Sequence, residues 1–252
     1  MDRNASVPPA GAFPLTRYSV LQAVASEDRG ERERAFGALA QGYWKPIYKY
    51  LRVRWRAAKE EAEDLTQEFF TRALEKQFFD RYDPAVARFR TYLRTCVDRF
   101  VANQRRAAGR SKRGGDLKAV PFDFAAVEGE LAESGIPESI DVEEYFQREW
   151  MRSFFEGAVE ALRRRCEELG KRAHFQLFER YDLEEGGDRP TYGRLAAELG
   201  LPVTQVTNYL SWVRREFRRL ALERLRATAA SEEEFRAEAR QLLGVEPPRG
   251  TR

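Results

Sequence analysis

Apolar residues recur at spacings of three and four along most of this chain, which is the period of an amphipathic α-helix. No run of alternating β-branched residues is long enough to predict a strand. We therefore expect an all-α protein with helices near 17–25, 31–56, 59–77, 84–108, 141–168, 171–181, 191–199 and 203–227. The apolar positions of the first half predict a core made of Phe36, Leu39, Tyr43, Ile47, Leu51, Leu65, Phe69, Leu93 and Phe100.

Composition along the chain predicts two helical domains with a linker between them. Residues 1–15 are rich in Pro, Ala and Gly and predict a disordered tail, and 16–113 form the first domain. Residues 114–149 are acidic and interrupted by Gly and Pro, which predicts an interdomain linker. Residues 150–227 form the second domain, and 228–252 are a charged tail. In the first domain, Pro46 predicts a kink or a restart of its helix.

The segment Thr191–Arg226 predicts a helix-turn-helix. A short helix runs into Gly200, Leu201-Pro202 turns the chain, and a second helix follows with an apolar stripe suited to packing on the first. The opposite face opens with short polar side chains suited to base edges in a major groove, namely Thr204, Gln205, Thr207, Asn208 and Ser211. Arg214, Arg215 and Arg218 follow within reach of phosphates. The alternative is an ordinary helical hairpin with a solvated arginine face.

Two helices of the first half present distinct polar faces. In Glu61–Lys76, Asp64, Gln67 and Glu68 lie opposite an apolar stripe and suit a partner's arginines, although a solvated helix face would look the same. The helix that follows is strongly basic and suits a nucleic-acid backbone, through Arg90, Arg94, Arg99 and Arg106 and through Arg110, Lys112 and Arg113 beyond them. The aromatic residues upstream could stack on unpaired bases, but we expect most of them in the core: Trp44, Tyr48, Tyr50, Trp55 and Tyr82.

Composition excludes several classes of protein. The 252 residues carry 34% charged side chains and a net charge of only +3, and no apolar run is long enough for a membrane span. Cys96 and Cys166 fit reduced thiols of a cytoplasmic protein, and with one histidine, His174, they make no zinc constellation. No Gly-rich phosphate loop and no acid–base pair appears. We expect no cofactor, no metal, no catalytic residue and no membrane partner.

In this order, these segments resemble the bacterial RNA polymerase sigma factors, most closely the small two-domain, extracytoplasmic-function-like (ECF-like) group of the sigma-70 family. The run Asp64-Leu65-Thr66-Gln67-Glu68-Phe69-Phe70 resembles the family's D-L-x-Q-E-x-F helix. Phe89-x-x-Tyr92-Leu93 is similar to its F-x-x-W-L helix, and Tyr192 to Arg219 resembles its C-terminal helix-turn-helix.

The resemblance implies a non-enzymatic factor that directs transcription initiation, with core RNA polymerase and promoter DNA as partners. Asp64, Gln67 and Glu68 would contact the clamp helices of the β′ subunit, and the second domain would lie at the β flap. Arg90, Arg94, Arg99, Asn103 and Arg106 would bind the minus-ten promoter element, although the family usually has Asn where Arg99 stands and Asp where Asn103 stands. The helix-turn-helix would read the minus-thirty-five element, and the acidic linker would imitate a phosphate chain in channels used by RNA.

The resemblance also implies an anti-sigma factor as a candidate partner. Two other classes stay open at this point. One is a stand-alone helix-turn-helix regulator that binds duplex DNA without polymerase, and the other is an all-helical adaptor whose basic helices bind an acidic partner.

Overall fold

The computed structural model describes residues 20–24, 26–76, 78–83, 85–107, 122–135, 141–184 and 190–247. The predicted tail at 1–15 and the basic residues Arg110, Lys112 and Arg113 lie outside the described residues. Within the described ranges every regular element is helical, which confirms the all-α prediction. None of these helices is long and apolar enough to cross a membrane.

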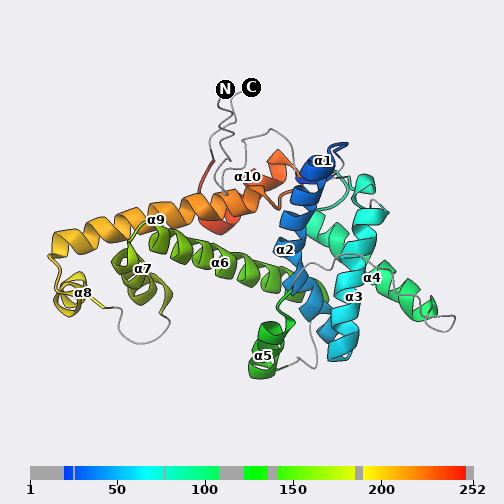
Figure 1. The fold of residues 1–252 in the computed structure, drawn as a ribbon, viewed down its shortest axis with the longest axis horizontal. Helices are drawn as coiled ribbons and strands as arrows, with labels where there is room; N and C mark the ends of the chain where they lie inside the picture. Colours follow the sequence, from blue (N-terminus) through cyan, green and yellow to red (C-terminus); the bar gives the residue numbers. More distant parts are fainter. Residues whose placement is uncertain are drawn as a thin grey trace, which may run out of the picture.

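The elements follow one another as a helical body, an arm that carries a helix-turn-helix and a helix that returns to the body (Figure 1). Their bounds are α1 Val20–Val24, α2 Arg29–Arg54, α3 Lys59–Glu75, the 3-10 turn η1 Phe78–Arg81, α4 Phe89–Ala107, α5 Phe124–Ser134, α6 Val142–Glu168, α7 Arg172–Phe178, the π-turn η2 Glu179–Leu183, α8 Tyr192–Leu199, α9 Val203–Arg226 and α10 Glu232–Leu243.

The central helix of the body is α2. Asp28 caps it by accepting a hydrogen bond from the Glu31 backbone N–H at 2.7 Å, and the helix then runs unbroken past the buried Pro46 without restarting. Leu39, Ile47 and Leu51 are fully buried and pack with side chains of α3, α4 and α6. Every predicted core residue of the first half is buried, so the apolar periodicity located this core correctly.

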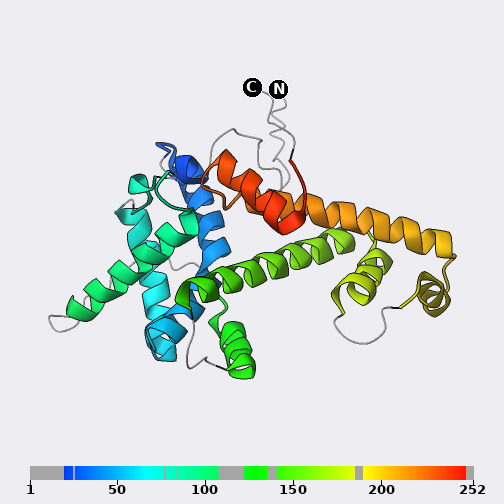
Figure 2. The ribbon, with the colours of Figure 1, turned by 180° about the vertical axis from the view of Figure 1, so that it is seen from behind.

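The arm is an antiparallel pair, α6 and α9, that carries the small helices α7 and α8 at its far end (Figure 1 and Figure 2). A second core joins these helices and includes Leu162, Cys166, Leu177, Leu195 and Val206. The other ends of α6 and α9 belong to the core of the body, through Trp150, Phe154, Ala221 and Leu225. The two long helices therefore link the helix-turn-helix to the body by continuous packing.

The segment expected as an acidic linker contains α5 and the first turns of α6. Phe124, Val127 and Leu131 of α5 are buried against α2, and its carboxylates bond to α2 as well. Glu128 accepts hydrogen bonds from Tyr48 at 2.6 Å and from Arg52 at 2.7 Å. This packing differs from a solvated linker because three apolar residues at helical spacing give α5 a face to bury.

The charged tail after the arm also contains a helix that the sequence interpretation did not include. Ser231 caps α10 by accepting from the Glu234 N–H at 3.1 Å, and Gly244 ends it in the left-handed conformation. Phe235 and Ala239 are buried in the core of the body. The domain boundaries drawn from composition stay a prediction, but the described parts of both segments pack on the body.

Candidate functional site

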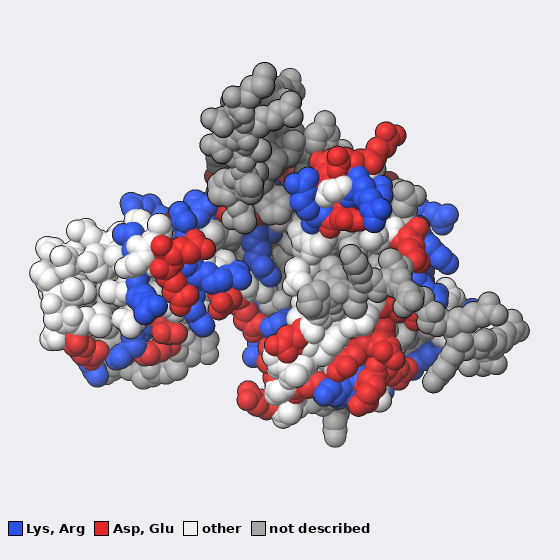
Figure 3. Space-filling model, in the orientation of Figure 1, with Lys and Arg blue, Asp and Glu red and all other residues white. Residues whose placement is uncertain are grey.

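The polar face of α3 is presented as the sequence predicts. Asp64 is exposed, Gln67 and Glu68 are half-buried, and all three lie opposite the buried Leu65 and Phe69. Figure 3 shows acidic side chains gathered over α3 on this side of the body. Glu68 also forms an ion pair with Arg72 one turn along the helix, at 2.5 Å. The structure therefore brings the three residues together on one accessible surface.

This face is held in place by the packing behind it. The Phe69 ring meets Phe100 of α4 edge-on, with centroids 5.6 Å apart, and the buried Thr66 hydroxyl donates to the Ala62 carbonyl at 2.7 Å. Because α3 is fixed to α2 and α4 by buried aromatic contacts, its outer side chains are presented on a rigid helix. A partner surface can meet such a face without first ordering it.

Three of the five predicted minus-ten residues lie on one exposed stripe of α4. Arg99, Asn103 and Arg106 are exposed and spaced four and three residues apart, which places them on the same side of the helix. The Arg106 guanidinium donates to the Asn103 side-chain oxygen at 2.8 Å. This stripe offers two guanidinium groups and an amide, a set suited to phosphates and base edges.

The other two arginines of α4 are engaged inside the protein. Arg94 is half-buried and pairs with Asp98 at 3.3 Å and with Glu143 of α6 at 2.7 Å. Arg90 is only 4% exposed, pairs with Glu238 of α10 at 2.5 Å and lies over the Trp150 ring, 3.8 Å from its centroid. In this arrangement Arg90 does not belong to the exposed stripe of α4.

The aromatic residues upstream of α4 are mostly core, as expected. Trp44, Tyr48 and Tyr50 are buried, while Trp55 and Tyr82 are half-buried. The Trp55 indole N–H donates to Asp98 at 2.9 Å, and the Arg105 guanidinium lies 5.3 Å from the Trp55 ring centroid. The exposed side of α4 therefore offers mainly arginines and polar groups to a ligand.

A helix-turn-helix forms where the sequence predicts it. Thr191 caps α8 by accepting from the Arg194 N–H at 3.2 Å, and Gly200 ends it with a φ of 64°, a conformation that favours glycine. Pro202 is the N-cap residue of α9. The five predicted base-reading side chains of α9 are all exposed in its first turns: Thr204, Gln205, Thr207, Asn208 and Ser211.

The arginines that follow on α9 have different environments. Arg215 and Arg218 are exposed and form no ion pair within the described part of the chain. Arg214 is half-buried and binds Asp182 through two hydrogen bonds, at 2.8 and 2.9 Å. This bidentate pair joins α9 to η2, so Arg214 has a structural partner that the sequence did not reveal.

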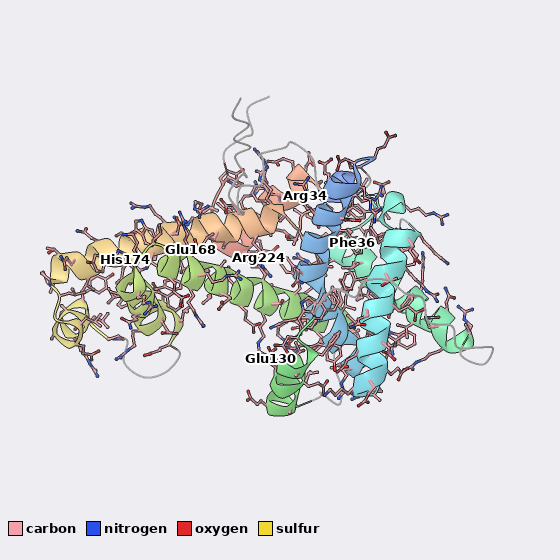
Figure 4. All side chains as sticks on the ribbon, viewed as in Figure 1. Arg34, Phe36, Glu130, Glu168, His174 and Arg224 are labelled. Carbon is pink, nitrogen blue, oxygen red and sulfur yellow. The ribbon has the colours of Figure 1, made fainter. Side chains whose placement is uncertain are left out.

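A ring stack joins α9 to α7. Figure 4 labels His174 in the arm. The His174 ring lies parallel to Tyr209, with centroids 3.7 Å apart, and meets Trp212 edge-on at 5.3 Å. Burial, and then the nearby Lys171, lower the pKa of His174, which favours its neutral form. His174 is buried, and its stacking on Tyr209 had no signal in the sequence.

Comparison with known proteins gives one match. Residues 39–111 match the family model of sigma-70 region 2, whereas no curated protein and no solved structure matches the chain. The matched range holds most of α2, all of α3 and all of α4, and therefore both faces described above. This match supports a place for the chain among the RNA polymerase sigma factors of the sigma-70 family.

Proposed function

We propose that this protein is a two-domain, ECF-like sigma factor that binds core RNA polymerase and directs it to promoters. The observation that carries the proposal is the exposed polar face of α3 inside the region 2 match. Asp64, Gln67 and Glu68 supply two carboxylates and an amide, which suit basic side chains of the β′ clamp helices.

The exposed stripe of α4 is the proposed minus-ten surface. Arg99 and Arg106 approach the promoter backbone, and Asn103 between them is placed for a base edge or a phosphate. Arg94 sits at the edge of this surface, held by Asp98 and Glu143. Arg90 is buried and paired with Glu238, so it can contact DNA only after it has left this carboxylate.

The arm supplies the proposed upstream contact. The first turns of α9 enter the major groove of the minus-thirty-five element, with Gln205 and Asn208 as the amides best suited to adenine. Arg215 and Arg218 bind phosphates on either side. Arg214, in contrast, supports the fold of the arm through Asp182. Catalysis belongs to the polymerase in this proposal, and this chain needs no cofactor of its own.

A binding experiment separates this proposal from a stand-alone regulator or an adaptor. The tagged, purified chain is incubated with purified core RNA polymerase, with and without a promoter fragment, and then captured on resin. A sigma factor retains the polymerase in the absence of DNA. Retention of DNA without polymerase would instead support a stand-alone helix-turn-helix regulator, and retention of neither would exclude both DNA-directed functions.

A further inference from the structure

A glycine of α6 makes room for an arginine of α9 where the two long helices pack together. A Cβ atom at Gly157 would overlap the Cζ and Nη2 atoms of Arg224 and lie 2.8 Å from its Nε atom, so the guanidinium lies directly against the backbone of α6. Arg224 is half-buried, and its neighbours Ala221 and Leu225 belong to the core of the body. Figure 4 labels Arg224 close to the end of α9 that meets the body. This contact places a permanent positive charge where the arm begins.

The guanidinium of Arg224 has no carboxylate partner among the described residues. Within that part of the chain it forms no ion pair and no hydrogen bond. The carboxylates that are near it in sequence, on both helices, bind other cations. These pairs are Glu156 with Lys45, Glu160 with Arg163, and Glu223 with Arg219. A guanidinium carries five N–H donors, so Arg224 retains donors for a ligand.

A second arginine adds to the positive charge beside Arg224. Arg164 follows Gly157 by seven residues, which places it two turns further along the same face of α6, and its side chain is exposed. Burial, and then Arg164, lower the pKa of Arg224, although an arginine stays protonated at physiological pH. A half-buried charge next to a like charge is unfavourable, and an anion that meets both groups would relieve this cost.

We propose that Arg224 and Arg164 form a binding site for a phosphoryl group, supplied by free phosphate or by a small phosphorylated metabolite. Guanidinium groups donate paired N–H bonds to phosphate oxygens, which gives such contacts both strength and direction. A phosphate held by Arg224 of α9 and Arg164 of α6 would join the two long helices at the start of the arm. The inference goes beyond the proposed function, because it involves neither polymerase nor promoter.

The position of Arg224 favours a small anion over the backbone of duplex DNA. Arg215 and Arg218 are exposed along α9, so a DNA backbone can meet them directly. Arg224 instead lies against α6 beside the body, and Figure 3 shows basic side chains at the hollow where the arm meets the body. A compact tetrahedral anion can approach a guanidinium between two helices more closely than a duplex can.

Thermal denaturation of the purified full chain tests the site, in sodium phosphate and in sodium chloride at equal pH and ionic strength. A ligand that binds only the folded state raises the melting temperature, and its concentration dependence gives an apparent Kd. We expect phosphate to raise the melting temperature of the wild type above the chloride value in a saturable way. Arg224→Met should weaken the apparent Kd for phosphate about tenfold or more, because charge-assisted hydrogen bonds are lost.

The matched control is Arg148→Met, which removes an exposed arginine near the beginning of α6 and should leave the phosphate effect unchanged. Arg164→Met should weaken the apparent Kd in the same direction as Arg224→Met. If phosphate stabilises the wild type and Arg224→Met equally, the effect is a general one of the salt and the site is overturned.

Gly157→Ala provides a second test that keeps the arginine in the chain. The added methyl group meets the far end of a flexible side chain, so the guanidinium is displaced while α6 can keep its place. We expect a loss of phosphate affinity similar to that of Arg224→Met, because the guanidinium no longer lies beside Arg164. Phosphate binding as tight as that of the wild type would overturn the site, even if Arg224→Met does not fold.

Separate titrations distinguish the sources of the phosphoryl group. Binding of ATP that Arg224→Met weakens would include phosphorylated metabolites among the ligands, whereas phosphate binding without ATP binding would restrict the site to free phosphate. If Arg224→Met weakens the binding of duplex DNA but leaves phosphate binding unchanged, Arg224 is a backbone contact and the small-anion site is wrong. Retention of core polymerase by the wild-type chain tests the proposed function separately, so the two failures are distinct.

Discussion

Alanine substitutions on the polar face of α3 should weaken binding to core polymerase while they leave the free energy of unfolding nearly unchanged. Alanine at Asp64, Gln67 or Glu68 removes side chains that point away from the core. The ion pair between Glu68 and Arg72 joins groups that are each 36% exposed, and pairs of this kind contribute about 0.3–0.5 kcal/mol. We therefore expect each substitution to change the free energy of unfolding by about 0.5 kcal/mol or less.

The expected loss of binding is several times larger. Truncating one partner of a buried, hydrogen-bonded charge pair in an interface costs about 2–5 kcal/mol, because the partner's charge is left unpaired. The lower value already corresponds to a roughly 30-fold weaker Kd for core polymerase. Asp64→Ala and Glu68→Ala should show this loss in full, and Gln67→Ala, which removes an uncharged amide, should show a smaller one.

The assay is the Kd of fluorescently labelled chain for purified core polymerase, with the melting temperature measured on the same samples. Glu167→Ala is the matched control, because Glu167 is an exposed carboxylate on α6, at the far end of the arm from α3. If all three α3 variants bind the polymerase as tightly as the Glu167→Ala control, the assignment of this face is refuted. If they bind weakly but also melt much lower, the loss reflects folding instead.

Further predictions concern the arm and α5. Gln205→Ala and Asn208→Ala should change the preferred upstream sequence in a randomised promoter library, at about 1–3 kcal/mol per lost base contact, and unchanged preferences would contradict base reading by α9. Arg218→Ala should weaken binding to all promoters alike and reduce the salt dependence of that binding. An effect that differs between promoter sequences would contradict a phosphate contact by Arg218. Glu128→Ala should cost about 1–3 kcal/mol of unfolding free energy, because the Tyr48 hydroxyl loses its acceptor and Arg52 loses its carboxylate and keeps only the Ala57 carbonyl. Chemical denaturation measures this cost, and an unchanged unfolding midpoint would contradict the docking of α5.

The helices of the body and of the arm were predictable because their signals are local. The turn at Gly200 and Pro202, and the apolar stripe that includes Val206 and Leu210, are readable from neighbouring residues. The polar face of α3 follows from the same periodicity, because the buried stripe decides which side chains remain outside. The placement of Asp64 on the surface needed no information from distant segments.

The helices α5 and α10 were not predicted, although their sequences contain local helix signals, because the composition of both segments favoured other interpretations. α5 begins after the capping residue Asp123 and buries Phe124, Val127 and Leu131, which are spaced as on one helix face. Acidic residues and flanking Gly and Pro favoured a linker instead. α10 lies in a charged tail, although Ser231 and Gly244 are ordinary helix-end residues. Both segments pack on the body through a small number of apolar side chains.

The environments of the arginines could not be predicted from local sequence. Arg90 and Arg99 look alike in a basic amphipathic helix, yet one is covered by Glu238 and the other is exposed. Arg214 likewise differs from Arg215 because Asp182, which precedes it by 32 residues, accepts both of its hydrogen bonds. Burial of a guanidinium depends on a carboxylate brought close by the fold, and no periodicity encodes that pairing.

Promoter-dependent transcription tests the central claim most directly. Core RNA polymerase, the purified chain and a library of upstream DNA fragments are combined, and the 5′ ends of the transcripts are sequenced. If the chain is a sigma factor, it should produce transcripts that start a fixed distance downstream of a shared two-part sequence. The Asp64→Ala variant should produce far fewer of them. Random initiation that is the same with and without the chain would contradict the account.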